Sequence, residues 1–316
     1  MATIIAELCQ NHNGDETLLN EMVHAAADAG ADYAKIQSIL ANDLTYRERF
    51  ETGQWDGDRR RAIKRPYQDE YDRLKPMDLD DDAHHRFIEQ CRSAGIKPLT
   101  TAFSRSRIPF LATLGFDAIK VASYDCASEP FLNELKPHFS HIYVSTGATL
   151  DCEIERAAQV LGDHSFSLLH CVTIYPTPLD EMHLVRLNYL RKLTPSVGFS
   201  DHSLVALDGI KASAVALLLG ADVVERHFTV LPPEGSRDGP VSIDPGQLAE
   251  LVRLARIDHG RLQDYVDQEI GDFSMMMGSE QRSLTETELL NRDYYRGRFA
   301  SKVGDKVIYN WDERPV

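Results

Sequence analysis

Short apolar runs recur along the chain, and most are followed by a stretch with helical spacing of apolar residues. Near-continuous apolarity is typical of strands that are buried on both faces of a sheet. Eight runs have this character: residues 3–8, 33–37, 96–103, 118–123, 141–147, 166–172, 196–201 and 222–228. The helical stretches cover residues 16–30, 80–95, 107–115, 127–138, 151–162, 181–193 and 207–220, and several end in Gly, the usual left-handed stop of a helix.

Eight alternating strand–helix units predict an α/β protein with a (β/α)8 TIM barrel. An open, doubly wound sheet is the alternative, and it is weakened because no GxGxxG motif follows the first run. We expect residues 1–272 to form the catalytic barrel and residues 273–316 to form a short C-terminal tail.

Residues 41–80 form a long, charged insertion after the second run. A loop of this length inside a domain is usually functional or mobile. Its segment RRRAIKR (59–65) indicates either a basic patch or a solvated face, and the solvated face is favoured.

The 316 residues carry a formal net charge of −15. This charge argues against non-specific binding to nucleic acid or to an acidic membrane, because both need a basic face. The sequence shows neither a signal-peptide pattern nor an apolar run near the ~18 residues that cross a bilayer. The five cysteines are scattered, without a CxxC pair. A cytoplasmic protein is therefore expected.

Polar residues stand at the ends of the predicted strands, where the active site of a TIM barrel forms. Lys35 and Lys120 lie inside apolar runs, and a buried ammonium is costly unless it is paired. They are either structural partners of a carboxylate such as Glu7, or part of an anion site. The anion site would suit a phosphate or carboxylate and would include Ser123, Ser145, Ser200 and the turn at Gly147.

Two histidines end neighbouring predicted strands, His202 in VGFSDHSL and His227 in ADVVERHFTV. A lone histidine at a strand end is more often a hydrogen-bonded core residue than a ligand. Two on adjacent strands with carboxylates beside them suit Mn²⁺, Zn²⁺ or Fe²⁺. From spacing alone, both interpretations stay open.

Seven strings resemble the strand-end motifs of the sialic acid synthase family, the N-acetylneuraminate synthase-like enzymes. They are IAELCQNHNGD, AKIQ, IKVASYD, VSTGAT, LLHCVTIYPTP, VGFSDHS and VERHFT, in order from residue 3 to about 245. The resemblance implies condensation of phosphoenolpyruvate with an open-chain aldose, commonly of the N-acylmannosamine type. The products would be a 2-keto-3-deoxy sugar acid and phosphate, and the enzyme would be a homodimer.

The resemblance also implies roles for individual residues. It places a divalent metal, Mn²⁺ first with Mg²⁺ or Co²⁺ as alternatives, on His202 and His227. The catalytic residues would be Glu7, Lys35, Lys120 and Asp125. The substrate-binding residues would be Gln37, Ser123, Ser145, Thr173, Tyr175, Ser200 and Asp238.

Four departures from the family pattern stand out. Thr173 and Ile174 precede Tyr175 where relatives often carry Asn or Ser, and Asp125 replaces a Glu. Asp238 is the nearest match to an acidic loop whose order differs here. Relatives end in a small antifreeze-like domain, whereas residues 273–316 look like a truncated remnant of linker and domain. We expect this tail either to dock on a barrel, with a partner's favoured, through Tyr294, Tyr295, Arg296 and Arg298, or to fray.

Other functions remain open at this stage. One is condensation with a non-acylated or phosphorylated aldose. Another is a non-catalytic barrel that binds sugar or phosphate, and a third is a metal-dependent sugar isomerase. The joint presence of the Lys, Ser and His sets favours the synthase.

Overall fold

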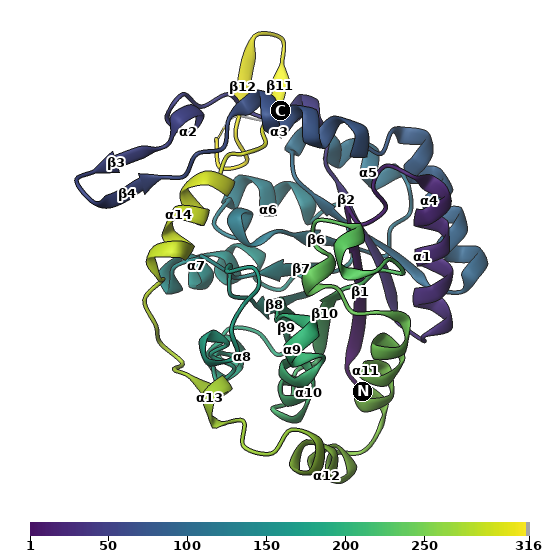
Figure 1. Ribbon diagram of the computed structural model, residues 1–316. Helices are drawn as coiled ribbons and strands as arrows, with labels where there is room; N and C mark the ends of the chain where they lie inside the picture. Colours follow the sequence, from purple (N-terminus) through teal and green to yellow (C-terminus); the bar gives the residue numbers. More distant parts are fainter. Residues whose placement is uncertain (314–316) are drawn as a thin grey trace.

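Eight parallel strands close into a barrel in the computed structural model, which describes residues 1–313 (Figure 1). Strand β1 pairs with both β2 and β10, so the sheet has no free edge and the open-sheet alternative is excluded. The strands are β1 (Thr3–Cys9), β2 (Tyr33–Ser38), β5 (Lys97–Ala102), β6 (Ala118–Val121), β7 (Ile142–Ser145), β8 (Phe166–His170), β9 (Val197–Asp201) and β10 (Val223–His227). The predicted (β/α)8 fold is confirmed, and each predicted run overlaps one of these strands.

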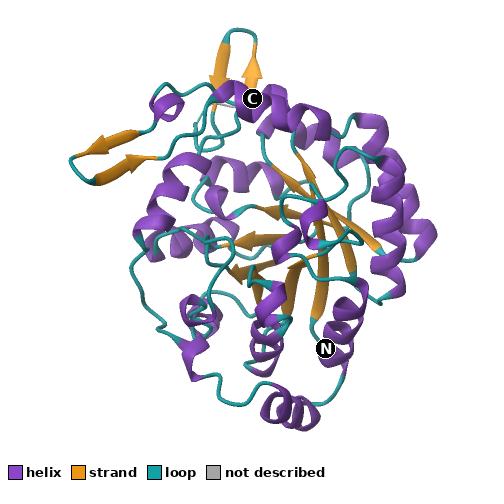
Figure 2. Ribbon diagram, in the orientation of Figure 1, coloured by secondary structure: helices purple, strands orange, loops and turns teal. Residues whose placement is uncertain are grey.

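Helices surround the barrel on its outer side (Figure 2). One follows each strand: α1 (Glu16–Asp28), α4 (Asp81–Ala94), α5 (Ile108–Thr113), α6 (Glu129–Leu135), α7 (Asp151–Leu161), α8 (Arg186–Arg191), α10 (Lys211–Leu218) and α11 (Pro245–Arg256). Then come α12 (His259–Glu269), α13 (Ser274–Met277) and α14 (Glu286–Tyr295). Among residues 1–313, no helix is long and apolar enough to cross a membrane.

Two predicted helices are interrupted in the structure where their periodicity suggests one continuous helix. The stretch 207–220 is divided into α9 (Val205–Asp208) and α10, because Gly209 takes a left-handed conformation with φ of 53°. In the stretch 181–193, the α-helix α8 begins only after His183, whose φ is 49°. Positive φ interrupts the helical hydrogen-bond ladder in both places.

The insertion between β2 and α4 has its own structure. It contains α2 (Arg49–Thr52), the hairpin of β3 (Gln54–Asp56) and β4 (Arg59–Ala62), and α3 (Tyr67–Leu74). The hairpin projects from the barrel and lies beside α14 (Figure 1). Arg59, Arg60 and Arg61 are exposed, as expected for a solvated face.

The barrel interior is arranged in layers by the two-residue period of its strands. The lower layer is an apolar cluster of Ile5, Tyr33, Leu99, Ala118, Tyr143, Leu169 and Val223. Two residues further along the same strands stand Glu7, Lys35, Thr101, Lys120, Ser145, Cys171 and Glu225. The floor of the barrel is therefore apolar, and a polar layer lies directly above it.

A buried ion pair joins β9 and β10 on the outer side of the barrel. Arg226 contacts Asp201, and both side chains have no exposed surface. Arg226 also donates to Ser203 Oγ at 2.9 Å and to the Gly209 carbonyl at 3.2 Å, and Ser213 of α10 donates to Asp201 at 2.6 Å. This network links two strands to the helix that covers them.

We predict that Arg226→Met lowers the free energy of unfolding by about 3–5 kcal/mol, because Asp201 would remain buried without its partner. Arg86→Met is the matched control, since the Arg86–Glu16 pair at 2.6 Å has side chains 46% and 43% exposed. The control should change stability by less than about 1 kcal/mol. Urea unfolding of both variants measures the difference. Equal losses of unfolding free energy in the two variants would show that the buried pair contributes no more to stability than the exposed pair.

Candidate functional site

A cavity of about 470 Å³ opens above the polar layer, at the C-terminal ends of the strands. Every predicted site residue except Thr173 lines it. Thr173 has no exposed surface, and its methyl carbon packs against Gly147. A Cβ added at Gly147 would be only 2.6 Å from that methyl carbon. Thr173 therefore supports the wall of the cavity from behind.

Two lysines and two glutamates form a buried cluster at the bottom of the cavity. Lys35 contacts Glu7 and lies 3.3 Å from Glu225, and it donates to Thr101 Oγ1 at 3.0 Å. Lys120 lies 3.2 Å from Glu225 and donates to Ser145 Oγ at 2.7 Å. The lysines are thus paired with carboxylates, as the structural interpretation expects, and they also face the cavity, so the anion site stays a prediction.

The charges in this cluster shift each other's ionisation. Burial lowers the pKa of Lys35 to about 7, and Glu225 acts in the opposite direction. Burial alone would raise the pKa of Glu225, but Lys120, Lys35 and the hydrogen bond from Ser200 lower it strongly. Glu225 is thus held as a carboxylate between the two lysines.

Small hydroxyl groups surround the lysines on one side. Ser123 Oγ accepts a hydrogen bond from the Gly147 amide at 3.1 Å, and Ser200 Oγ donates to Glu225 at 2.7 Å. Gly147 is required here, because a Cβ would meet Ser123 Oγ at 2.9 Å as well as Thr173. Two ammonium groups and three serines offer the donors that a phosphate or carboxylate needs.

The two predicted metal-binding histidines lie next to each other at the cavity wall. Their ring centroids are 5.0 Å apart, and Tyr175 packs edge-on against His202 at 4.3 Å. Burial lowers the pKa of both imidazoles, so both are neutral near pH 7, which is the form that binds metals. Within residues 1–313, His227 Nδ1 is buried and has no hydrogen-bond partner.

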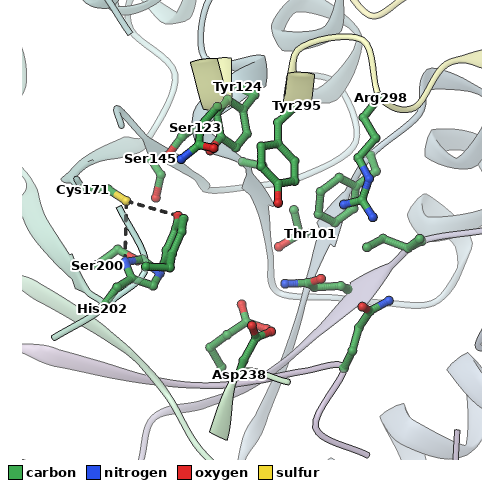
Figure 3. A pocket seen from close by; sticks show the side chains of 18 of the residues that line it. Thr101, Ser123, Tyr124, Ser145, Cys171, Ser200, His202, Asp238, Tyr295 and Arg298 are labelled. Atoms are coloured by element: carbon green, nitrogen blue, oxygen red, sulfur yellow. Dashed lines mark hydrogen bonds between the residues drawn. The ribbon is translucent and has the colours of Figure 1, made fainter. Parts of the chain in front are cut away.

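Asp238 lies near His227, on the opposite side of the cavity from Tyr295 and Arg298 (Figure 3). Donor atoms of Cys9, His227 and Asp238 lie within 4.8 Å of one another. Cys9 is a residue that the sequence analysis did not assign to the site.

The remaining predicted residues form a second polar wall. Asp125 accepts hydrogen bonds from Asn310 at 2.9 Å and from Ser128 at 3.3 Å. Burial raises its pKa to about 6 although these hydrogen bonds oppose the shift. Gln37 and Tyr175 line the same cavity, so these polar side chains lie beside the lysines and serines.

The C-terminal tail covers the cavity of its own chain. Tyr295 stacks on Tyr124 with ring centroids 4.9 Å apart, and Asn291 donates to the Thr173 carbonyl at 2.7 Å. Figure 3 shows Tyr295 and Arg298 pointing from the tail into the cavity. The tail thus lies on the barrel of its own chain, and docking on a partner's barrel stays a prediction.

Four arginines line the outer part of the cavity: Arg65, Arg73, Arg237 and Arg298. Glu70 accepts from Arg73 at 2.5 Å and also contacts Arg298. Arg73 additionally donates to Gln10 at 3.1 Å. The mouth of the cavity therefore carries more cationic than anionic side chains near Glu70.

The sequence indicated Tyr295 and Arg298 only as docking anchors of the tail. The main residues that it did not assign are Glu225, Arg65, Arg73, Arg237, Asn291 and Asn310. Glu225 stands two positions before His227 in one strand, so the two-residue period could have placed it beside the lysines. The contacts of Arg298 with Glu70 and of Asn310 with Asp125 join distant parts of the chain. No local pattern signals such pairs.

Known proteins are similar to this chain in both sequence and fold. The NeuB family profile matches residues 22–264. N,N'-diacetyllegionaminic acid synthase of Campylobacter jejuni is 32% identical over 267 residues, which are 80% of this chain and 75% of that protein. The enzyme of the same name from Legionella pneumophila is 30% identical over 318 residues, covering 95% of this chain and 83% of that protein.

A solved structure gives a similar result. The N-acetylneuraminic acid synthetase of Leptospira borgpetersenii, crystallised with citrate, superposes with a TM-score of 0.70 at 26% identity. The superposition covers 91% of this chain and 89% of that chain.

We predict that Glu70→Gln destabilises the protein by about 1.5–3 kcal/mol at pH 7, because two arginines lose a charged acceptor. Burial opposes the shift, but Arg73 and Arg298 lower the pKa of Glu70 from 4.5 to about 2. The stabilisation is therefore complete above pH 4.5 and is lost as the pH falls toward 2. The stability difference between variant and parent should shrink over that range.

Glu286→Gln is the control for this experiment, because Glu286 of the tail pairs with Arg59 of the β3–β4 hairpin but is 61% exposed. Urea unfolding from pH 7 down to the acid limit of the native state measures both variants. A Glu70→Gln effect that is no larger than the control's, or that grows as the pH falls, would contradict the assigned role of Glu70.

Proposed function

The chain belongs to the NeuB family, and from that membership we propose that it condenses phosphoenolpyruvate with an open-chain, N-acylmannosamine-like aldose. It is an enzyme of the class that joins phosphoenolpyruvate to a sugar with formation of a C–C bond. The proposed products are a 2-keto-3-deoxy sugar acid and phosphate. The observation that carries the proposal is the buried pair Lys35 and Lys120 with three serines, directly beside two neutral histidines.

We assign phosphoenolpyruvate to the bottom of the cavity. Its phosphate and carboxylate would take hydrogen bonds from Lys35, Lys120, Ser123, Ser145 and Ser200. The lysines already lie within 3.3 Å of carboxylate oxygens of Glu225, so an anion can take a similar place without rearrangement of the strands. Charge-assisted hydrogen bonds of this kind are short and strong.

The chemistry of the donors fits a divalent metal at the histidines. Lys35 and Lys120 are offset by Glu7 and Glu225, so the cluster alone is close to neutral and leaves the charge of phosphoenolpyruvate uncompensated. Both imidazoles are neutral, His202 is buried and His227 is half-buried, and within residues 1–313 the buried, unpartnered Nδ1 of His227 is a free donor atom. A bound divalent cation supplies a Lewis acid for the sugar carbonyl.

The other residues would position the sugar and the water. We assign the sugar hydroxyls to Gln37, Asp125 and Tyr175, which line the cavity. C3 of phosphoenolpyruvate forms a bond to the aldehyde carbon, water adds at C2, and the C2–O bond to phosphate breaks. Glu7 is buried beside Lys35, and we assign to it the orientation of this water and the acceptance of its proton.

A phosphorylated aldose is the second candidate acceptor, and the arginines at the cavity mouth favour it. Arg237 is exposed, and Arg65 is half-buried at the cavity wall. Arginine matches the geometry of a phosphate better than that of a neutral polyol. The homodimer and the cytoplasmic location remain predictions.

We predict that the protein releases phosphate from phosphoenolpyruvate only when a divalent metal and a suitable aldose are present. The panel should contain N-acetylmannosamine, mannose and N-acetylmannosamine 6-phosphate. Mass spectrometry of the product should give the mass of both substrates plus water minus phosphoric acid. Lys120→Met should raise the KM for phosphoenolpyruvate by roughly 10- to 150-fold, through loss of a charged hydrogen bond.

The arginines provide the control that separates the two acceptors. Arg237→Ala should lower kcat/KM for the 6-phosphate and leave kcat/KM for N-acetylmannosamine unchanged if the acceptor is phosphorylated. Phosphate release without any aldose would indicate a phosphatase. No release with any aldose would favour the non-catalytic barrel.

A further inference from the structure

We propose that Cys9 and Asp238 bind the same divalent cation as His227, so that the metal site contains a thiolate. This inference deepens the proposed function and rests on its metal. Neither the histidine pair nor the match to known synthases assigns a metal-binding role to the cysteine.

The three donors come from different parts of the chain and meet at one point. Cys9 ends β1, His227 ends β10, and Asp238 lies in the loop that follows β10. Strand β10 lies between β1 and β9 in the barrel, so His227 has Cys9 on one side and His202 on the other. The donor atoms of Cys9, His227 and Asp238 are within 4.8 Å of one another, a separation that small side-chain movements close onto one ion.

The backbone at Cys9 is shaped to present its side chain. Its φ is 42°, in the left-handed region that favours glycine, and the β1–β2 register shifts between Glu7 and Cys9. The Cys9 amide donates to Glu7 Oε1 at 2.7 Å, which helps to hold this turn. A residue with a Cβ in this conformation is strained, and such strain is concentrated at functional sites.

The surroundings of Cys9 differ from those of a structural cysteine. Cys91 and Cys126 are packed in the main apolar core, whereas Cys9 is 1% exposed and lies in none of the apolar clusters of residues 1–313. It instead lies beside a carboxylate and an imidazole. His227 Nδ1 is buried without a partner in the described chain, which independently points to an absent ligand.

A thiolate changes the choice of metal. Thiolate and imidazole ligands favour Zn²⁺, Fe²⁺ and Co²⁺ over Mg²⁺ and Mn²⁺, which prefer oxygen donors. Coordination removes the thiol proton of Cys9, so metal binding should release a proton to the solvent. The preferred metal would then differ from the Mn²⁺ expected from the family resemblance.

Cobalt titration of the metal-free, full-length protein tests the inference without turnover. One equivalent of Co²⁺ should produce a thiolate-to-cobalt charge-transfer band in the near ultraviolet. Cys9→Ser should abolish the band, and Asp238→Asn should weaken Co²⁺ affinity by at least tenfold. Circular dichroism checks that each variant is folded.

Two cysteine variants serve as controls. Cys171 Sγ lies 3.8 Å from His202 Nδ1, so Cys171→Ser tests the competing thiol, and the exposed Cys152 tests non-specific binding. Both control variants should retain the band. A band that survives in Cys9→Ser, or one that is lost in Cys171→Ser, would overturn the assignment.

The unmutated protein alone can overturn the inference, even if Cys9→Ser fails to fold, and a band that persists in Cys171→Ser then supports Cys9. Tight Co²⁺ binding without a charge-transfer band overturns the thiolate but leaves the proposed condensation intact. A band in a protein that releases no phosphate with any aldose supports the site and overturns the proposed reaction instead.

Discussion

Two lysines and two glutamates inside the barrel impose the constraint on which the site depends. Each ion loses several kcal/mol of hydration on burial, and pairing alone seldom makes such a cluster better than an apolar core. Lys35, Lys120, Glu7 and Glu225 are all at most 4% exposed. The cluster is tolerated because every ammonium has a carboxylate and a hydroxyl partner, namely Thr101 for Lys35 and Ser145 for Lys120. A cluster that is costly to fold, yet faces a cavity, is better explained by ligand binding than by stability.

Much of the fold follows from the sequence because the apolar runs of buried strands and the helical spacing of apolar residues are both visible in it. Eight apolar runs give the strands, and the stretches between them give the helices. The site could be predicted in outline because parallel strands end at one rim, so polar residues after each run must meet there. The two-residue period explains the detail, since Lys35 follows Tyr33 and Lys120 follows Ala118 on the same inward face. The break at Gly209 was not predicted, because apolar spacing continues across it.

The parts that escaped prediction depend on contacts between distant residues. Arg298 and Glu70 are 228 positions apart, and Asn310 and Asp125 are 185 positions apart. Neither pair has a sequence pattern of its own. The tail was expected on a barrel, but its individual contacts with the chain's own barrel could be seen only in three dimensions. Cys9 reads in sequence as an ordinary buried thiol, and only its φ and its neighbours distinguish it.

The position of bond cleavage in phosphoenolpyruvate tests the proposed reaction most directly. In the proposed reaction, the lysines and serines would hold the phosphate and carboxylate, and a water oriented by Glu7 would attack C2. The bridging oxygen should therefore leave with phosphate. Phosphoenolpyruvate labelled with heavy oxygen at the bridge should give labelled inorganic phosphate and an unlabelled keto acid. Label that stays in the keto acid would mean cleavage of the P–O bond and would contradict the account.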